Sequence, residues 1–295
     1  MRLRVLGAAA GGGLPQWNCG CANCGAARAG DPRIPPRTQD SLALSADGER
    51  WLLVNASPDV LTQIARTPAL HPRSGRATPI AGAVLTNGDL DHVLGLFSLR
   101  ESTPLVVWCT AAVREGLERN PMLRTLQRFA GHLTFVELAL DRAVDALGVS
   151  LTPFALPGKL PKHLEGIAEA RPEDNVGLHL ERGGARAVVA TAAASLGAWT
   201  ERIDGADVAL FDGTFWSSDE LVRLGLGTSR AEDMAHMPVG GASGSLAALG
   251  SIRARRRVFA HVNNTNPMLL EGSEAQREVV AAGFEIAVDG MELFT

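Results

Sequence analysis

Strand-like and helix-like segments follow one another in the same order twice along this 295-residue chain, and this repetition restricts the fold to few architectures. The predicted strands are 2–7, 38–47, 49–57, 80–86, 103–110, 132–138, 150–156, 176–182, 185–194, 206–216, 257–267 and 284–290. The predicted helices are 57–67, 92–102, 111–129, 217–225, 244–252 and 273–283. No linker-like stretch separates the halves. We therefore expect one α/β domain over residues 1–295, with two packed sheets and helices outside.

The composition predicts a protein that buries a core and does not bind nucleic acid. Hydrophobic residues make up 46% of the chain and charged residues 20%, which are ordinary values for a globular protein. The formal net charge of −4 argues against a nucleic-acid partner. The basic run 253–257 precedes an apolar segment and is interpreted as a solvated loop that enters a strand.

The sequence contains no predicted membrane span or export signal. No segment approaches the roughly 18 consecutive apolar residues that cross a bilayer. The apolar part of segment 1–13 is too short and too rich in glycine for a signal peptide. We therefore expect a cytoplasmic protein with no membrane partner. The sequence leaves the oligomeric state open, a homodimer included.

Three of the four cysteines, Cys19, Cys21 and Cys24, fall within six residues. In a cytosolic chain this clustering is typical of a metal site rather than of disulfides. The C-x-C-x-x-C spacing allows three thiolates to converge on one tetrahedral ion, so we predict a structural zinc loop at about residues 17–26. The alternative, buried thiols without a metal, is less favoured because neighbouring free thiols in a loop oxidise readily. Cys109 lies in a predicted strand and is interpreted as a core residue.

Polar side chains crowd the end of the predicted strand 80–86. The segment 87–92 reads Asn-Gly-Asp-Leu-Asp-His and lies between this strand and an apolar, helix-like run. Such an arrangement directs several polar side chains to one point above the edge of a sheet. Asp91 and His92 are a suitable ligand pair for a transition metal.

Other strand ends add candidate ligands to this pair. Asp212 follows one apolar strand, His261 follows another, and His236 lies in a loop with proline and glycines behind it. Together with Asp91 and His92, these residues predict a metal site. Among the remaining histidines one could line a pocket, one alternates within a strand, and two are interpreted as surface or turn residues: His163, His179, His71 and His132, respectively.

The segment LTNGDLDHVLGLF (85–97) resembles the HxHxDH signature of the metallo-β-lactamase superfamily, with Asn87 and Asp89 where the two leading histidines belong. FDGTFW (211–216) resembles the superfamily's bridging-aspartate segment, and AHVNNTNP (260–267) the segment of its last histidine. This resemblance implies an αββα sandwich of two mixed β-sheets with helices on the outer faces.

A closer resemblance covers essentially the whole chain. The blocks GAAAGGGLPQWNCGCANC, RTQDSLALS, VNASPD, DNVGLHL, HMPVGG and HVNNTNP are together similar to a family of pyrroloquinoline quinone (PQQ) biosynthesis proteins in that superfamily. The blocks LPQWNCGCANC and HVNNTNP are the specific ones. In related superfamily members a histidine completes the three-cysteine loop. The corresponding residue here is Asn264, whose amide oxygen is a poor zinc ligand. We therefore take Asn264 as the candidate fourth ligand, and the sequence leaves this position open.

Hydrolases of the superfamily hold two zinc ions, and the departures here imply one. Asn87 and Asp89 replace two ligands of the first ion, and the segment 170–177 offers no histidine for the third. The ligands of the second ion are retained, namely Asp91, His92, Asp212 and His261. Two imidazoles with one or two carboxylates suit Fe(II) and O₂ chemistry better than zinc, although zinc would also bind.

The family resemblance implies an enzyme that uses iron and O₂ to hydroxylate the tyrosine ring of a small Glu-Tyr-derived PQQ precursor. In this interpretation His236 is the acid or base, and His163 and Asp89 orient the substrate. Two alternatives remain open. One is a zinc-dependent phosphodiesterase-like hydrolase, and the other is a non-catalytic carrier or transport factor for PQQ or its precursor.

Overall fold

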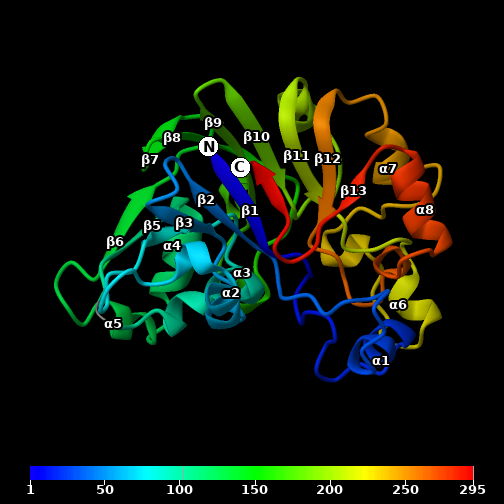
Figure 1. Cartoon of the computed structure of the whole chain (residues 1–295), viewed down its shortest axis with the longest axis horizontal. Coiled ribbons are helices and arrows are strands. Elements are labelled where there is room, and N and C mark those ends of the chain that lie inside the picture. The colour runs from blue at the N-terminus through cyan, green and yellow to red at the C-terminus, as the bar shows by residue number, and fades with distance from the viewer. Residues whose placement is uncertain (102, 295) are drawn as a thin grey trace.

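Two β-sheets packed face to face form the centre of the protein. The computed structural model describes residues 1–101 and 103–294. In this part of the chain each sheet contains seven strands, and helices cover the outer faces (Figure 1). The predicted αββα sandwich is confirmed. The two termini lie side by side, because the first and last strands are paired (Figure 1).

The first sheet has the strand order β14-β1-β2-β3-β4-β5-β6. Neighbouring strands are antiparallel from β14 to β3 and parallel from β3 to β6. The strands are β1 (Arg2–Gly7), β2 (Ser41–Ser45), β3 (Trp51–Val54), β4 (Ile80–Val84), β5 (Leu105–Cys109), β6 (Leu133–Glu137) and β14 (Glu292–Phe294).

The second sheet has the strand order β13-β12-β11-β10-β9-β8-β7. It is antiparallel from β7 to β10 and parallel from β10 to β13. Its strands are β7 (Val144–Ala146), β8 (Val149–Ala155), β9 (Val176–Arg182), β10 (Ala185–Ala190), β11 (Ala206–Asp212), β12 (Ala254–Ala260) and β13 (Glu285–Ile286).

Strand alternation explains the layers. Leu42 and Leu44 of β2 face the second sheet, whereas Ala43 between them faces the helices, because successive side chains of a strand point to opposite faces. Helices α2 to α5 pack on the first sheet, and α1 and α8 pack on the second. The α-helices are α1 (Ala22–Arg28), α2 (Val60–Arg66), α3 (Leu90–Val93), α4 (Ala111–Glu118), α5 (Leu123–Leu126), α6 (Glu220–Arg223), α7 (Ser245–Ala248) and α8 (Glu274–Ala281). Within the described residues, none of the helices combines the length and apolar character needed to cross a bilayer.

Several predicted boundaries were wrong. The predicted helix 111–129 is two short helices, α4 and α5, because Pro121 between them has no N–H to donate. The predicted final strand 284–290 pairs only over Glu285–Ile286, and the true last strand, β14, was not predicted. In the cysteine segment, α1 begins at Ala22, so that Cys24 lies on a helix.

The predicted helix 92–102 begins earlier and ends sooner. Helix α3 starts at Leu90 and continues as a 3₁₀ turn over Leu94–Ser98, while residue 102 lies outside the described residues. The N–H of Gly95 donates to the carbonyl of Ala56, and a Cβ at Gly95 would lie 2.1 Å from the Ser57 carbonyl oxygen. Glycine therefore lets this turn lie directly against the neighbouring backbone.

Gly95→Ala should lower both stability and metal binding. The new methyl group must displace the Ser57 backbone or the helix that carries His92, at a cost of about 2–4 kcal/mol. Chemical denaturation would measure the loss, and metal titration of the folded variant would show a weaker site. Gly25→Ala is the matched control because, outside its own helix, no atom lies within 4 Å of the added Cβ. Equal stability of the two variants would contradict this explanation.

Candidate metal centre

The ends of three strands, one from the first sheet and two from the second, bring the predicted ligands together. Strand β4 leads into Asp91 and His92, β11 ends at Asp212, and His261 directly follows β12. Strands β11 and β12 are parallel neighbours in the second sheet, so Asp212 and His261 meet at one edge of that sheet. Asp91 and His92 come to the same place from the end of β4 in the first sheet. His261 has a φ of 55°, which is uncommon for a non-glycine residue and typical of strained functional positions.

The histidine and carboxylate atoms form two triads that share His261. In the first, Oδ2 of Asp91 lies 3.2 Å from Nε2 of His261 and 3.9 Å from Nε2 of His92. The second joins Asp212, His236 and His261. Ligand atoms within each triad lie within 4.8 Å of one another, close enough to bind one ion. The structure thus brings together all four predicted ligands and His236, but in two groups.

The hydrogen bonds of Thr86 determine the tautomer of His92. Oγ1 of Thr86 donates its single proton to Oδ1 of Asn55 at 2.9 Å. Nδ1 of His92, at 3.1 Å from the same hydroxyl oxygen, must therefore be the donor in their contact. A neutral ring with its proton on Nδ1 leaves the lone pair on Nε2, which is the atom directed at the first triad.

Thr214 fixes His261 in the same way. Its hydroxyl donates to Oδ1 of Asp212 at 2.6 Å, because an ionised carboxylate can only accept. Nδ1 of His261 lies 2.9 Å from the hydroxyl oxygen and must donate to it. Metal-bound histidines are oriented by such contacts to the second ring nitrogen, so the arrangement fits a metal ion bound to the two Nε2 atoms.

Thr86→Val and Thr214→Val should each weaken metal binding about 10- to 100-fold. Valine keeps the shape of threonine but cannot accept the Nδ1–H of the histidine, which then loses its orientation. Competition titration with a chromophoric chelator would measure the dissociation constants. Thr200→Val is the control, since among the described residues the Thr200 hydroxyl donates to the Gly197 carbonyl and to none of the predicted ligands. Unchanged affinity in both threonine variants would rule out this role.

The charges around the triads favour a bound cation. Burial alone would lower the pKa of His261, but its hydrogen bond with Asp91 and the nearby charges of Asp40 and Asp212 raise that pKa to about 9. Burial opposes ionisation of Asp91 as well, yet His92 and His261 lower its pKa. An imidazolium therefore occupies a position where a metal ion would replace its proton.

Asp40 is a member of this environment that sequence reasoning missed. It is 1% exposed, and burial raises the pKa of its carboxyl to about 6. Oδ2 accepts from the Thr191 hydroxyl at 3.0 Å, whereas Oδ1 has no hydrogen-bond partner among the described residues. Asp40 belongs to the block RTQDSLALS, but nothing in the sequence connects it with His261.

Asparagine side chains lie where the sequence resemblance places the ligands of the first superfamily ion. Nδ2 of Asn87 donates to Oδ1 of Asn175 at 3.3 Å, and Oδ1 of Asn87 accepts from the Asp89 N–H at 2.9 Å. Nδ2 of Asn175 donates to the Ala192 carbonyl at 2.7 Å. These amides satisfy one another and lack the imidazoles that would bind a second zinc ion.

The three predicted catalytic residues lie in different places. Nδ1 of His236 is 2.6 Å from Oδ2 of Asp212, which leaves Nε2 available as a base or ligand. Asp89 lines the cavity beside Asp91. His163 does not line that cavity; it borders a separate pocket of about 10 Å³ next to Leu164. His132, interpreted as a surface or turn residue, does lie at a turn, where its N–H donates to the Phe129 carbonyl at 3.0 Å, but it is buried, with 1% exposure.

The cavity beside the triads has a volume of about 230 Å³. Asp89, Asp91, His92, His236 and His261 contribute its polar wall. Other lining residues include Phe215, Met234, Lys159 and Lys162. A small molecule can therefore reach the ligand atoms of the first triad.

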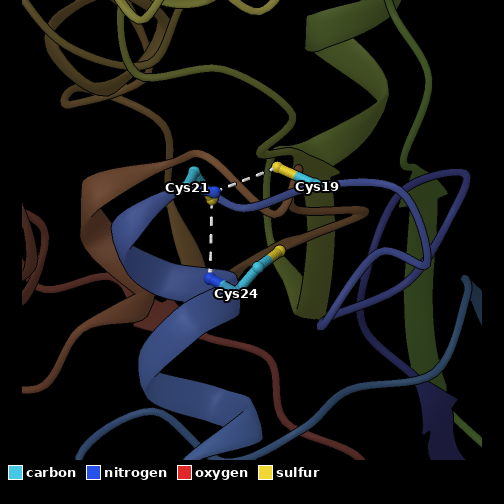
Figure 2. A group of neighbouring side chains, drawn as sticks. All are labelled: Cys19, Cys21 and Cys24. Atoms are coloured by element: carbon cyan, nitrogen blue, oxygen red, sulfur yellow. Dashed lines mark hydrogen bonds between the residues drawn. The ribbon is translucent and has the colours of Figure 1, made fainter.

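The three cysteines form a second metal-binding group (Figure 2). Cys21 caps the N-terminus of α1, Cys24 lies in its first turn, and Cys19 lies in the preceding loop. Their sulfur atoms lie within 4.8 Å of one another. Burial raises the pKa of Cys21 to about 11. Burial also opposes ionisation of Cys19, but the hydrogen bonds that its sulfur accepts, above all from the Cys21 N–H, lower the pKa of Cys19 overall.

The side chain of Asn264 covers these sulfurs. Its Nδ2 lies 3.1, 3.6 and 3.3 Å from the Sγ atoms of Cys19, Cys21 and Cys24. Turned about its Cβ–Cγ bond, the amide would present Oδ1 to the same point. The group therefore fits a tetrahedral zinc with three thiolates and one amide oxygen, and the role of Asn264 as fourth ligand stays a prediction.

Comparisons with known proteins agree with this architecture. The beta-lactamase superfamily domain matches residues 50–262. A diphosphatase of the PhnP family (TM-score 0.69, 18% identity, 100% of this chain and 97% of that chain) shares the fold. The chain therefore belongs to the beta-lactamase superfamily, whose fold and site here define a metal-dependent class of protein.

More similar relatives specify the family. Coenzyme PQQ synthesis protein B from Methylobacterium nodulans is 48% identical over 299 residues, 99% of both chains, and that from Gluconacetobacter diazotrophicus is 43% identical over 306 residues. The crystal structure of Zn²⁺-bound PqqB from Methylobacterium extorquens has a TM-score of 0.95 at 43% identity and covers 100% of both chains. The chain belongs to the PqqB family.

Proposed function

We propose that this protein acts in PQQ biosynthesis as an oxygenase with a single active-site iron, and that it hydroxylates the tyrosine ring of a Glu-Tyr-derived precursor. The observation that carries the proposal is the pairing of one carboxylate–diimidazole triad, Asp91, His92 and His261, with amides at the neighbouring site. The names of the curated relatives, coenzyme PQQ synthesis protein B, support the pathway.

The ligand set supports iron. Two imidazoles and one carboxylate on one side of an ion, with open positions opposite, are typical of Fe(II) oxygenases. When bound there, iron would supply the activation of O₂. Hydroxylation inserts one oxygen atom into an aromatic C–H bond and reduces the other to water, so it consumes two electrons and two protons from an external reductant.

The surrounding residues supply positioning and proton transfer. His236 lines the cavity and its Nδ1 is held by Asp212, so the free Nε2 can accept or deliver a proton at the substrate phenol. Phe215 also lines the cavity, with its ring centroid 6.0 Å from that of His236, and offers an apolar surface to an aromatic ring. Asp89 contributes a carboxylate whose pKa is raised, chiefly by burial.

A metal-dependent hydrolase is the second candidate. The triad of Asp212, His236 and His261 offers a further set of ligand atoms beside the first, as a dinuclear hydrolase requires. The amide pair Asn87–Asn175 speaks against it, because that position lacks metal-binding imidazoles. Zinc-dependent turnover of a bis-aryl phosphodiester would favour the hydrolase over the oxygenase.

The oxygenase is tested with iron-loaded protein, a Glu-Tyr dipeptide, ascorbate and O₂. The chain contains no tyrosine, so any catechol found after total hydrolysis of the mixture comes from the dipeptide. We expect O₂ uptake together with catechol formation, and neither with zinc-loaded protein. Absence of both with fully iron-loaded protein would contradict the proposal, and tight metal-independent binding of PQQ would favour a carrier instead.

A further inference from the structure

Lysine is almost absent from this protein. Of its 28 basic residues 26 are arginine, and the two lysines are Lys159 and Lys162. Both line the 230 Å³ cavity at the metal triads, and no arginine does so within the described residues. Lysine and arginine are not equivalent, because the ammonium group is a compact charge on a flexible stem whereas guanidinium is a rigid planar fork.

The segment that carries the lysines is fixed to the rest of the cavity wall. The Leu156 N–H donates to the Asn175 carbonyl at 2.9 Å, and the Pro157 carbonyl accepts from Ala194 at 2.8 Å. Pro161 packs against Gly88, where an added Cβ would lie 3.2 Å from Cγ of the proline. The side chain of Leu164 is buried and anchors the C-terminal end of the segment that carries the lysines. The backbone is thus positioned while the two long side chains stay free to meet a ligand.

Neither lysine ammonium group has a hydrogen-bond or ion-pair partner among the described residues. Across residues 1–101 and 103–294, neither Lys159 nor Lys162 has a carboxylate within 4 Å or donates a hydrogen bond. By contrast, Arg171 on the adjoining wall is paired with Glu115 at 3.0 Å. Two unpaired cations beside one cavity, with no partner of their own, are suited to an anionic ligand.

We propose that Lys159 and Lys162 bind carboxylate groups of the substrate and hold its aromatic ring against Phe215, next to Asp91, His92 and His261. The ligand class is a small amino-acid-derived molecule with an aromatic ring and at least two carboxylates. The two lysines are positioning residues, since they act through the substrate's carboxylates and not at the reacting carbon. This inference deepens the proposed function and depends on it for the identity of the substrate.

A second cavity provides room for such a molecule. It has a volume of about 490 Å³ and shares Gly158, Lys159 and Asn175 with the first. Lys159 therefore stands where the two cavities join, while Lys162 borders only the first. A dipeptide-sized ligand can place its ring in the first cavity and extend past Lys159 into the second.

Another explanation is that the lysines only balance the carboxylates of the metal site. Lys159 does lower the pKa of Asp89, although burial outweighs it and that pKa is raised overall. Charge balance of this kind would act on metal binding and would not distinguish a charged ligand from a neutral one. The two explanations therefore differ in an experiment that varies the charge of the ligand.

The test is calorimetric titration of zinc-loaded protein with Glu-Tyr and with its diamide, which lacks both carboxylates. We expect Glu-Tyr to bind at least tenfold more tightly than the diamide. Lys159→Gln/Lys162→Gln should bind Glu-Tyr at least tenfold more weakly and the diamide unchanged. Arg66→Gln, an exposed arginine at the end of α2, is the matched control and should behave like the unaltered protein.

A second measurement uses the protein without substitution. Reductive methylation with ¹³C-formaldehyde keeps the charge and labels three amines, Met1, Lys159 and Lys162, because the chain has no other lysine. Both lysine signals should shift with one saturation curve as Glu-Tyr is added, and the Met1 signal should not. Static lysine signals, or equal affinity for Glu-Tyr and its diamide, would overturn the proposal.

The experiments distinguish a failure of the oxygenase proposal from a failure of the carboxylate-binding proposal. Catalytic hydroxylation with unmoved lysine signals would leave the oxygenase standing and remove the carboxylate site. Saturable lysine shifts without O₂ uptake by iron-loaded protein would support the carboxylate site and contradict the oxygenase reaction.

Discussion

His92→Ala is expected to remove the active-site metal and to lower kcat/KM for the proposed hydroxylation by at least about a thousandfold, or roughly 4 kcal/mol of transition-state stabilisation. His92 is 1% exposed, and its Nε2 is one of three donor atoms in the first triad. Alanine leaves Asp91 and His261 with too few ligands to retain the ion. Metal analysis after gel filtration and initial-rate kinetics would measure both effects.

The control for this substitution is His179→Ala. His179 lies on β9 and contacts Glu181 at 3.9 Å, away from the triads. It should keep the full metal content and activity near that of the unaltered protein. If His92→Ala kept its active-site metal, or lost no more activity than His179→Ala, the first triad would not be the metal site.

Cys24→Ser should release the structural zinc and lower the melting temperature on the order of 10 °C. Cys24 is fully buried and lies in the first turn of α1, which packs on the second sheet. In the predicted site the ion joins this segment to Asn264 in the loop after β12, and the variant should lose that link. Zinc analysis and differential scanning calorimetry would measure the change.

Cys109→Ser is the matched control. Cys109 is also buried, but it lies on β5 outside the cysteine group. The serine hydroxyl costs about 1–3 kcal/mol where it replaces a buried thiol, yet the zinc content should stay unchanged. Loss of zinc from both variants, or from neither, would contradict the assignment of the three-cysteine site.

The fold and the main site were predictable because their signals are local. A buried strand followed by Asn87-Gly88-Asp89-Leu90-Asp91-His92 directs polar groups to a sheet edge wherever that sheet lies in the molecule. The order of strands and helices predicted the two layers. Asp212 and His261 could be added because each directly follows an apolar strand. Cys19, Cys21 and Cys24 are close in sequence, so their convergence needed no tertiary information.

The remaining features depend on contacts between distant segments. Thr86 and Thr214 determine the tautomers of His92 and His261. The sequence alone does not show which side chain a threonine hydroxyl will hydrogen-bond. The three residues of β14 are too few for a strand pattern, and they form a strand only because β1 offers a free edge.

The two lysines show what composition alone cannot predict. The composition shows that lysine is rare in this chain. Only the structure shows that both lysines line the same cavity, which is the basis for assigning them a role in binding. His163 does line a pocket, as its sequence context suggested, but that pocket is not the metal cavity. The short 3₁₀ turn Lys162–Leu164 turns Lys162 toward the metal cavity and His163 toward a different pocket.

The most direct test is a crystal structure of protein loaded anaerobically with Fe(II), with anomalous data collected above and below the iron edge. We predict one iron peak within about 2.0–2.3 Å of Asp91 and the Nε2 atoms of His92 and His261, and a separate zinc peak at the three cysteines. Two ions bridged by Asp212, or no iron peak at the triad, would contradict the account.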